Sequence, residues 1–287
     1  MSELSGQEEG EETPDIEVRE LGAGDFTAVA RIARATGQPE TGAGPDSSYL
    51  AHITGRGRML VAVEDGGEVV AFGGVVPVGA VLQLTDLFVS PERQGCGIGR
   101  RLLQALVGAP KLWMTFASSH PRAVRLYASA GLAPRWPLYY LRGPNPARLT
   151  ARFAAPVTAE KVDPLRAASA ERALTRIDRS ADYRYWTRDG GSAGVVLHAD
   201  GRLVAAAAVS GDEVAHLCCP DALYAGAAVR AAAAQLRARQ VRFCIPGPHP
   251  ALPSLLEDGY AIEDCDTHMS SRPGLVSETA LLSPALI

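Results

Sequence analysis

The sequence has little of what marks several common classes of protein. Lysine occurs only at Lys111 and Lys161, and no basic run is interleaved with aromatic residues, so nucleic-acid binding has little support. The five cysteines are odd in number and contain no C-x-x-C pair. This argues against a disulfide framework or a structural zinc site, so we expect no metal. A reducing cytoplasm is the location that fits best.

Long apolar runs and a basic leader are also missing. The longest uncharged stretch, residues 69–85, is broken by glycines and Pro77, which favours two strands and a turn over a membrane span. The N-terminus lacks the features of a signal peptide. Residues 1–17 hold seven acids and no base. We expect residues 1–14 to be a disordered acidic leader, because so few apolar side chains cannot order it; attraction of a cationic substrate is the alternative.

What is present in residues 15–143, the first half, is the pattern of a mixed α/β domain. Short runs of apolar residues alternate with amphipathic stretches such as Leu102, Leu103, Leu106 and Val107 at helical spacing. We expect strands at 16–21, 59–63, 68–76, 81–89, 111–117 and 136–141, and helices at 26–34, 47–53, around 102–107 and at 121–129.

A glycine-rich stretch lies between the strand at 81–89 and the helix around 102–107. It reads Arg-Gln-Gly-Cys-Gly-Ile-Gly-Arg-Arg over residues 93–101. A G-x-G-x-x-G fingerprint would need glycine where Arg100 stands, and a Walker A loop would need a lysine, so neither common nucleotide motif fits. The first amides of a helix still attract anions, and glycines let a ligand approach the backbone. The stretch therefore predicts a pyrophosphate cradle.

These residues resemble a known family. Gln94-x-x-Gly97-x-Gly99, preceded by Val89-Ser90-Pro91-Glu92, is similar to the acyl-CoA signature of the GNAT superfamily of N-acetyltransferases. A second stretch, residues 120–132, resembles that family's next motif, except that His120 stands where asparagine is common. The resemblance covers roughly residues 15–143 and implies an acetyl-CoA donor.

The resemblance assigns a role to each part of the first motif. It places Leu87, Phe88 and Val89, at the end of the strand, on the pantetheine arm and acyl group. The loop and helix start would hold the pyrophosphate, through Gln94, Gly95, Cys96, Gly97, Ile98, Gly99 and Arg100. His120 would either contact the cofactor or cap the helix that follows it, and capping is the role we favour.

Two residues are candidates for proton transfer in direct acyl transfer to an amine. By resemblance, Tyr127 is the general acid that protonates the leaving thiolate; otherwise it is a helix residue packed on the core. Asp86 is a candidate base because it precedes the cofactor-binding end of the strand; otherwise it is a strand acid facing solvent, and water or backbone takes the proton. Cys96 is a poor candidate for a covalent acyl-enzyme, because no histidine or aspartate near it in sequence would activate it.

The second half, residues 166–287, repeats the order of elements after a linker and helix start at 144–165. Its sequence predicts a helix over 222–239 and strand pieces at 260–262 and 267–271. Tyr183, Tyr185 and Trp186 form an aromatic cluster that would line an acceptor pocket or pack in the core, and we favour the core. Phe243-Cys-Ile, His249-Pro250 and Gly259 follow one another as Trp113-Met-Thr-Phe, His120-Pro121 and Gly131 do. We interpret this as an internal duplication giving two GNAT-like domains in tandem. The second copy has Cys219-Pro220-Asp221 in place of the glycine loop and Leu255 in place of the tyrosine. It is therefore expected to bind no CoA.

The resemblance of residues 15–143 to the GNAT superfamily implies an acetyl-CoA-dependent N-acetyltransferase that acts on an unidentified primary amine. The second half would wall the acceptor pocket or pair with another chain, so a homodimer is open. Transfer to oxygen and longer acyl groups also remain open. The rivals are a non-catalytic CoA-binding regulator of the same fold and an interaction protein whose glycine loop only caps a helix.

Overall fold

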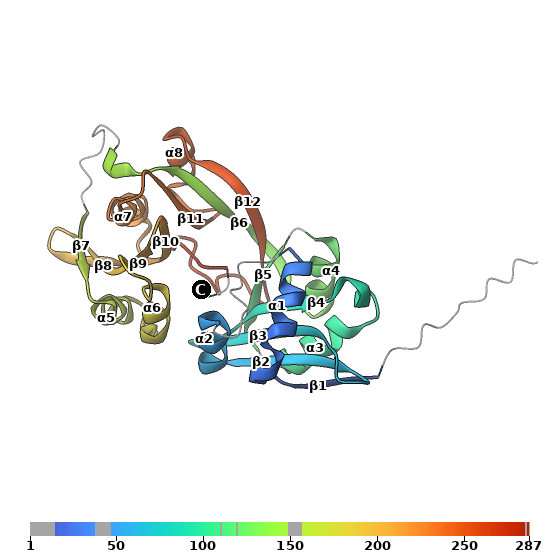
Figure 1. The fold of residues 1–287 in the computed structure, drawn as a ribbon. Helices are drawn as coiled ribbons and strands as arrows, with labels where there is room; N and C mark the ends of the chain where they lie inside the picture. The colour runs from blue at the N-terminus through green and yellow to red at the C-terminus, as the bar shows by residue number, and fades with distance from the viewer. Residues whose placement is uncertain are drawn as a thin grey trace, which may run out of the picture. The chain divides into compact units, whose positions relative to one another are not determined.

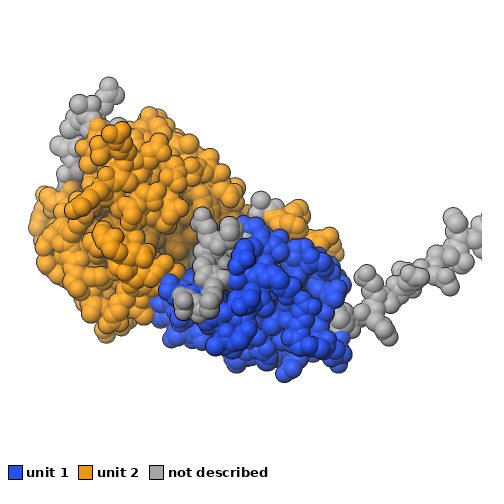
Figure 2. All heavy atoms as spheres, viewed as in Figure 1, with its two compact units in different colours: residues 1–75, 86–108 blue, residues 76–85, 109–287 orange. Residues whose placement is uncertain are grey.

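The computed structural model describes residues 15–37, 47–109, 111–118, 120–148, 157–284 and 286. The predicted leader, residues 1–14, lies outside this range, as do residues 149–156 of the expected linker. The chain divides into two compact units, residues 1–75 with 86–108 and residues 76–85 with 109–287 (Figure 2). The division passes through two strands, and the expected domain boundary at 143–166 stays a prediction.

The first unit is built from the N-terminal strands and three amphipathic helices. Its elements are β1 (Ile16–Glu20), η1 (Ala23–Asp25), α1 (Phe26–Ala35), α2 (Ser48–Arg56), β2 (Arg58–Glu64), the greater part of β3 (Val69–Val78), the end of β4 (Val81–Val89), η3 (Pro91–Arg93) and α3 (Ile98–Val107) (Figure 1). Each helix buries one apolar stripe, such as Leu102, Leu103 and Leu106 of α3. This stripe fixes α3 against the core, and with it the loop that precedes α3.

The second unit holds the remaining elements. They are β5 (Trp113–Ala117), α4 (Pro121–Ser129), β6 (Ala133–Pro144), η4 (Pro146–Arg148), β7 (Thr158–Val162), α5 (Pro164–Thr175), α6 (Ser180–Trp186), β8 (Ala193–Ala199), β9 (Arg202–Ser210), β10 (Glu213–Cys218), α7 (Ala222–Ala233), β11 (Gln240–Pro246), α8 (Leu252–Glu257) and β12 (Ala261–Ser270). No helix of the described residues is long and apolar enough to cross a membrane.

Strand order gives the two halves the same plan with one exchange. In the first unit the order is β1-β2-β3-β4, and in the second it is β4-β5-β12-β6-β11-β10-β9-β8-β7. β4 is parallel to β5, and β10 is parallel to β11. The first half is thus a run of five strands completed by β12, which pairs with β5. The second half is a run of five completed by β6, which pairs with β11. The second run includes β7, which lies in the segment expected as a linker.

Small side chains let the second half pack closely. The buried residues of α7 are four alanines and Val229, and α7 lies near β9, whose residues Ala205–Ala208 are all buried. Alanine on both surfaces allows helix and sheet to approach, and alanine also favours the helix itself.

The structure corrects several sequence-based expectations. The helix expected over 222–239 ends at Ala233, because Asn145 donates to the carbonyls of Leu236 and Ala238 and holds the following segment outside the helix. The strand expected at 136–141 runs over Ala133–Pro144 despite three prolines. The two strand pieces at 260–262 and 267–271 are one strand, β12.

Candidate functional site

The loop that follows β4 needs glycine at two positions. Gly95 has φ +97° and Gly97 has φ +81°, conformations that L side chains adopt only with strain. A Cβ placed at either residue would meet no atom within 4 Å in the described part of the chain. The space beside both glycines is therefore open, as a backbone cradle for a ligand requires.

Helix α3 begins at this loop without a side-chain cap. Gly97 is its N-cap residue, its first turn has no acid, and among the described residues no side-chain cap bonds to its first amides. The exposed Arg100 and Arg101 add positive charge near this end of the helix. Amides at a helix N-terminus lack partners within the helix and lie at the positive end of its dipole. The arrangement suits an anion such as a pyrophosphate.

Three contacts hold the base of the loop. Ser90 donates its amide to the Val70 carbonyl at 2.8 Å, and the Gln94 side chain donates to the Val89 carbonyl at 3.1 Å. Arg93 pairs with Glu64 of β2. The side-chain nitrogen of Gln94 thus holds the end of β4. A contact of Gln94 with the donor stays a prediction.

The end of β4 carries the residues expected on the donor arm. Pairing of β4 with β5 ends at Leu84 and Thr115, before Leu87, Phe88 and Val89. The Phe88 ring packs on Phe72 at a centroid distance of 5.3 Å. The Phe88 side chain is thus half-buried against the core residue Phe72, and a contact of Phe88 with the donor stays a prediction.

Asp86 lies inside the first unit, and the solvent-facing alternative for it is wrong. Its exposed fraction is 4 %, and one carboxylate oxygen accepts a hydrogen bond from the Tyr49 hydroxyl at 2.6 Å. Tyr49 belongs to α2, far from Asp86 in sequence, and the sequence analysis missed it. The only signal for Tyr49 in the sequence was its place on the apolar side of a short helix. That place predicts that Tyr49 is buried, but it does not predict a hydrogen bond to Asp86.

Tyr127 and His120 belong to α4 of the second unit. Tyr127 is buried, and its carbonyl accepts the amide of Leu132 at 3.0 Å, next to the closing Gly131. His120 is the N-cap residue of α4, where its Nδ1 accepts the Arg122 amide at 3.3 Å. The expected capping role is confirmed. The catalytic role of Tyr127 stays a prediction.

The corresponding helix of the second half has its N-terminus closed. Asp221 is the N-cap residue of α7 and accepts the Leu223 amide at 2.9 Å. A carboxylate thus stands where α3 has open glycine backbone. It would repel a phosphate group, so the start of α7 does not suit an anion as the start of α3 does.

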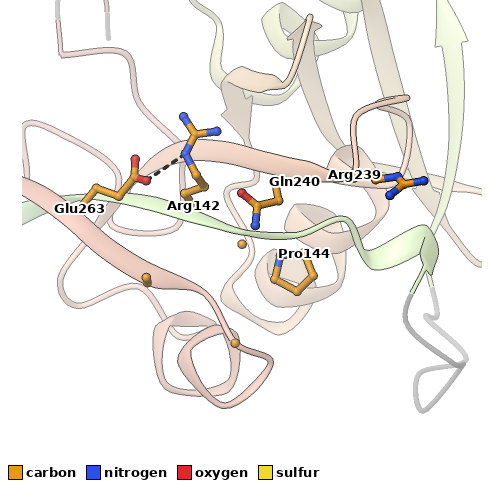
Figure 3. A pocket seen from close by; sticks show the side chains of 8 residues that line it. Arg142, Pro144, Arg239, Gln240 and Glu263 are labelled. Carbon is orange, nitrogen blue, oxygen red and sulfur yellow. Dashed lines mark hydrogen bonds and ion pairs between the residues drawn. The ribbon is translucent and has the colours of Figure 1, made fainter.

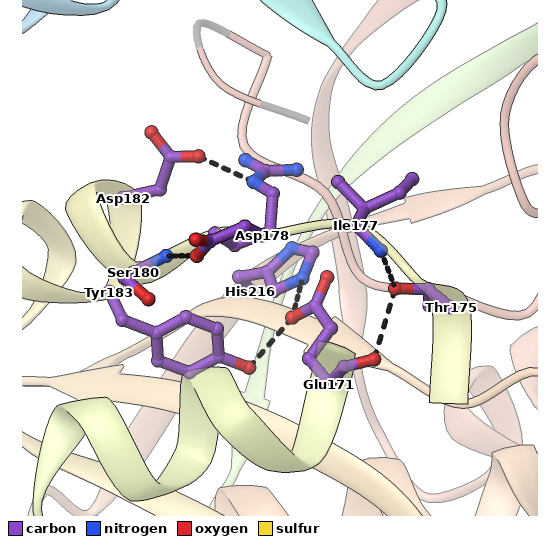
Figure 4. A network of polar contacts seen from close by, with 9 residues as sticks. Glu171, Thr175, Ile177, Asp178, Ser180, Asp182, Tyr183 and His216 are labelled. Carbon is purple, nitrogen blue, oxygen red and sulfur yellow. Dashed lines mark hydrogen bonds and ion pairs between the residues drawn. The ribbon is translucent and has the colours of Figure 1, made fainter. Parts of the chain in front are cut away.

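A buried polar network joins the helices of the second half to β10 (Figure 4). Glu171 accepts hydrogen bonds from Tyr183 at 2.8 Å and His216 at 3.0 Å. Burial acts to raise the pKa of Glu171, but His216 and Arg179 outweigh it and lower the pKa. Tyr183 and Trp186 are buried here, as core packing predicts, whereas Tyr185 is only partly buried.

His268 is a further residue that the sequence analysis missed. It is buried on β12 in register with Phe116 of β5 and Trp136 of β6, and its ring lies 4.2 Å from that of Trp136. Neither ring nitrogen has a hydrogen-bond partner among the described residues. Burial lowers the pKa of His268 to about 4, so the imidazole is neutral at pH 7.

A surface pocket of about 440 Å³ lies near one end of β6 and β11 (Figure 3). It is lined by Arg142, Gly143, Pro144, Arg239, Gln240, Gly259, Ala261 and Glu263. Arg142 pairs with Asp212 at 3.2 Å and with Glu263 at 2.9 Å. These carboxylates offset the charge of Arg142, and no residue expected at the active site lines the pocket, so we do not place the reaction there.

Comparisons with known proteins agree with these features. The Acetyltransferase (GNAT) family model matches residues 27–132. A putative acetyltransferase from Pyrococcus horikoshii has a similar fold, with a TM-score of 0.70 and 17% identity over 95% of this chain and 96% of that one. A GCN5-related N-acetyltransferase from Anabaena variabilis gives 0.60 and 12%, over 89% and 72%. No match was found among curated proteins.

Proposed function

We propose that the protein transfers an acetyl group from acetyl-CoA to a primary amine, because the GNAT acetyltransferase family model matches residues 27–132. The observation that supports this best is the uncapped start of α3. Gly95 and Gly97 leave open space there, so the donor's pyrophosphate would fit the loop and the first amides of the helix.

The proton steps fall to residues that the chain holds in buried positions. Acetyl-CoA supplies the acetyl group as a thioester, and the amine displaces the thiol directly. Asp86 takes the proton that the amine loses, directly or through water, while Tyr49 orients the carboxylate. Tyr127 gives its proton to the thiolate as the carbon–sulfur bond breaks. Tyr49 is a positioning residue in this scheme.

The second half is, in this proposal, a copy of the first half that no longer binds a donor. The matching strand runs support it, and so does the carboxylate of Asp221 at the start of α7. The second half would then shape acceptor binding.

Transfer to a panel of amines, followed by mass spectrometry of the acetylated products, tests the reaction. Tyr127→Phe should lower kcat about 100-fold or more with little change in donor affinity. Tyr260→Phe is the matched control, since Tyr260 is buried and its hydroxyl has no partner among the described residues. Equal activity of the two variants would remove Tyr127 from the mechanism.

The same assay separates the roles of Asp86 and Tyr49. Asp86→Asn should abolish the rise of kcat/KM with pH that a carboxylate base produces, while Tyr49→Phe should shift that rise and keep it. Acetyl-CoA binding without turnover of any amine would favour a non-catalytic regulator. No acetyl-CoA binding by calorimetry would overturn the proposal.

A further inference from the structure

Strands β10 and β11 of the second half are paired only near their starts and separate beyond that point. β10 and β11 share one register pair, Glu213 with Arg242, although β10 continues to Cys218 and β11 to Pro246. The first half opens in the same way, where the pairing of β4 with β5 ends at Leu84 and Thr115.

The C-terminal segment, residues 279–282, lies in the opening between β10 and β11. Leu281 exchanges two backbone hydrogen bonds with Leu217 of β10, at 2.9 and 3.1 Å, and the next residue, Leu282, donates its amide to the Cys244 carbonyl of β11 at 3.1 Å. The segment thus binds both strands through its backbone, as an added strand would.

Side chains fasten the segment at its start. The Thr279 hydroxyl donates to the Cys219 carbonyl at 2.6 Å. His249 accepts the Ala251 amide at Nδ1, so its Nε2 carries the proton and donates to the Thr279 carbonyl at 3.2 Å. Ala280, Leu281 and Leu282 are buried, and Leu281 packs in the main core cluster of the second half.

The residues that hold the segment have counterparts at the proposed donor site. His249-Pro250 corresponds in sequence to His120-Pro121, and both histidines accept the amide two residues ahead. Cys219-Pro220 corresponds to Ser90-Pro91 at the end of β4. The opening filled by the segment is therefore the second half's version of the one that would receive the donor arm.

We propose that residues 279–282 are a built-in occupant of the second half's donor cleft. An extended peptide and a pantetheine arm share a chain of amide donors and acceptors, so one cleft backbone suits either. The segment and the Asp221 cap would together leave the chain with one donor site. The comparison with the donor arm rests on the proposed function; the occupancy of the cleft does not.

The test uses the full chain with a protease recognition sequence inserted at Gly274, in the exposed turn before the segment. After cleavage of the folded protein, size-exclusion chromatography and mass spectrometry measure whether fragment 275–287 stays bound. We expect it to stay. Leu281→Asp should release it, and Glu278→Gln, at an exposed position, should not. Loss of the unmodified fragment, or retention of the Leu281→Asp fragment, would overturn the proposal.

A second measurement tests the likeness to a donor cleft. The cleaved Leu281→Asp chain, from which the fragment has been released, is saturated with CoA at the first site. It should then bind pantetheine at one further site per chain by calorimetry, and the cleaved chain that keeps its fragment should not. Unchanged circular dichroism would show that the chain is still folded. No added pantetheine site in a folded chain would contradict the likeness. An inactive enzyme that retains its fragment would refute the proposed function alone.

Discussion

The starts of α3 and α7 differ at the residue that leaves a helix N-terminus open to an anion or closes it. Helix α3 follows β4, and α7 follows β10, the corresponding strand of the second half. Both helices bury an apolar face. Gly97 leaves the first amides of α3 without a side-chain partner, while Asp221 supplies a carboxylate to those of α7. Two helices in corresponding places of the strand order can thus differ in how well they suit a phosphate group through the residue at one N-cap.

The largest expected effect is a pH dependence that arises in the second unit. Burial lowers the pKa of His249 and of His268 to about 4, from an ordinary value of 6.5. The folded protein therefore favours the neutral rings. Their contribution to the free energy of unfolding is complete above pH 6.5 and is lost as the pH falls towards 4. The loss is about 3 kcal/mol for each histidine. Urea unfolding at pH 7 and pH 4 measures the loss, and His268→Phe should reduce it by about half.

Closing α3 as α7 is closed should remove donor binding. Gly97→Asp places a carboxylate beside the proposed pyrophosphate site, and we expect acetyl-CoA affinity to fall about 100-fold, near 2.7 kcal/mol. Gly108→Asp is the matched control: Gly108 ends the same helix with φ +61° and open space around its Cβ, so it carries similar strain. Calorimetry with equal losses in both variants would contradict the assignment.

Cysteine labelling should separate the loop from the second half. Burial raises the pKa of Cys219 to about 11 and also raises the pKa of Cys218 and Cys244. Iodoacetamide at pH 7.5 should therefore modify the partly exposed Cys96 and Cys265. Acetyl-CoA at ten times its Kd should slow labelling of Cys96 about tenfold, because only the free chain reacts. Cys265 is the internal control, and equal protection of both would argue against the loop site.

The smallest effect concerns the cap of the second half. Asp221→Ala removes the hydrogen bond to the Leu223 amide and should lower the free energy of unfolding by about 1 kcal/mol. Acetyl-CoA affinity should stay unchanged, because the cap belongs to the half without the proposed donor site. Thermal unfolding and calorimetry on one preparation measure both, and a loss of donor affinity would show that the halves are not separate in binding.

Local patterns predicted the elements whose ends are set by short-range chemistry. The strand at 81–89 and the helix at 121–129 have the expected bounds, because Pro91 follows the first and His120-Pro121 with Gly131 frames the second. The strand β7 and the helix α6 were not expected. β7 lies in a segment whose composition suggests a linker, and its strand conformation comes from pairing with β8.

The sequence by itself determined where the glycine loop lies and that the second half has no such loop. It also determined which side of each amphipathic helix is apolar, since all of these follow from residues close together in the chain. Only the tertiary structure decided that β12 completes the strand run of the first half, that Tyr49 bonds Asp86 and that residues 279–282 fill the opening between β10 and β11. Each of these joins residues far apart in sequence, where backbone pairing and burial select the partner and no local pattern encodes it.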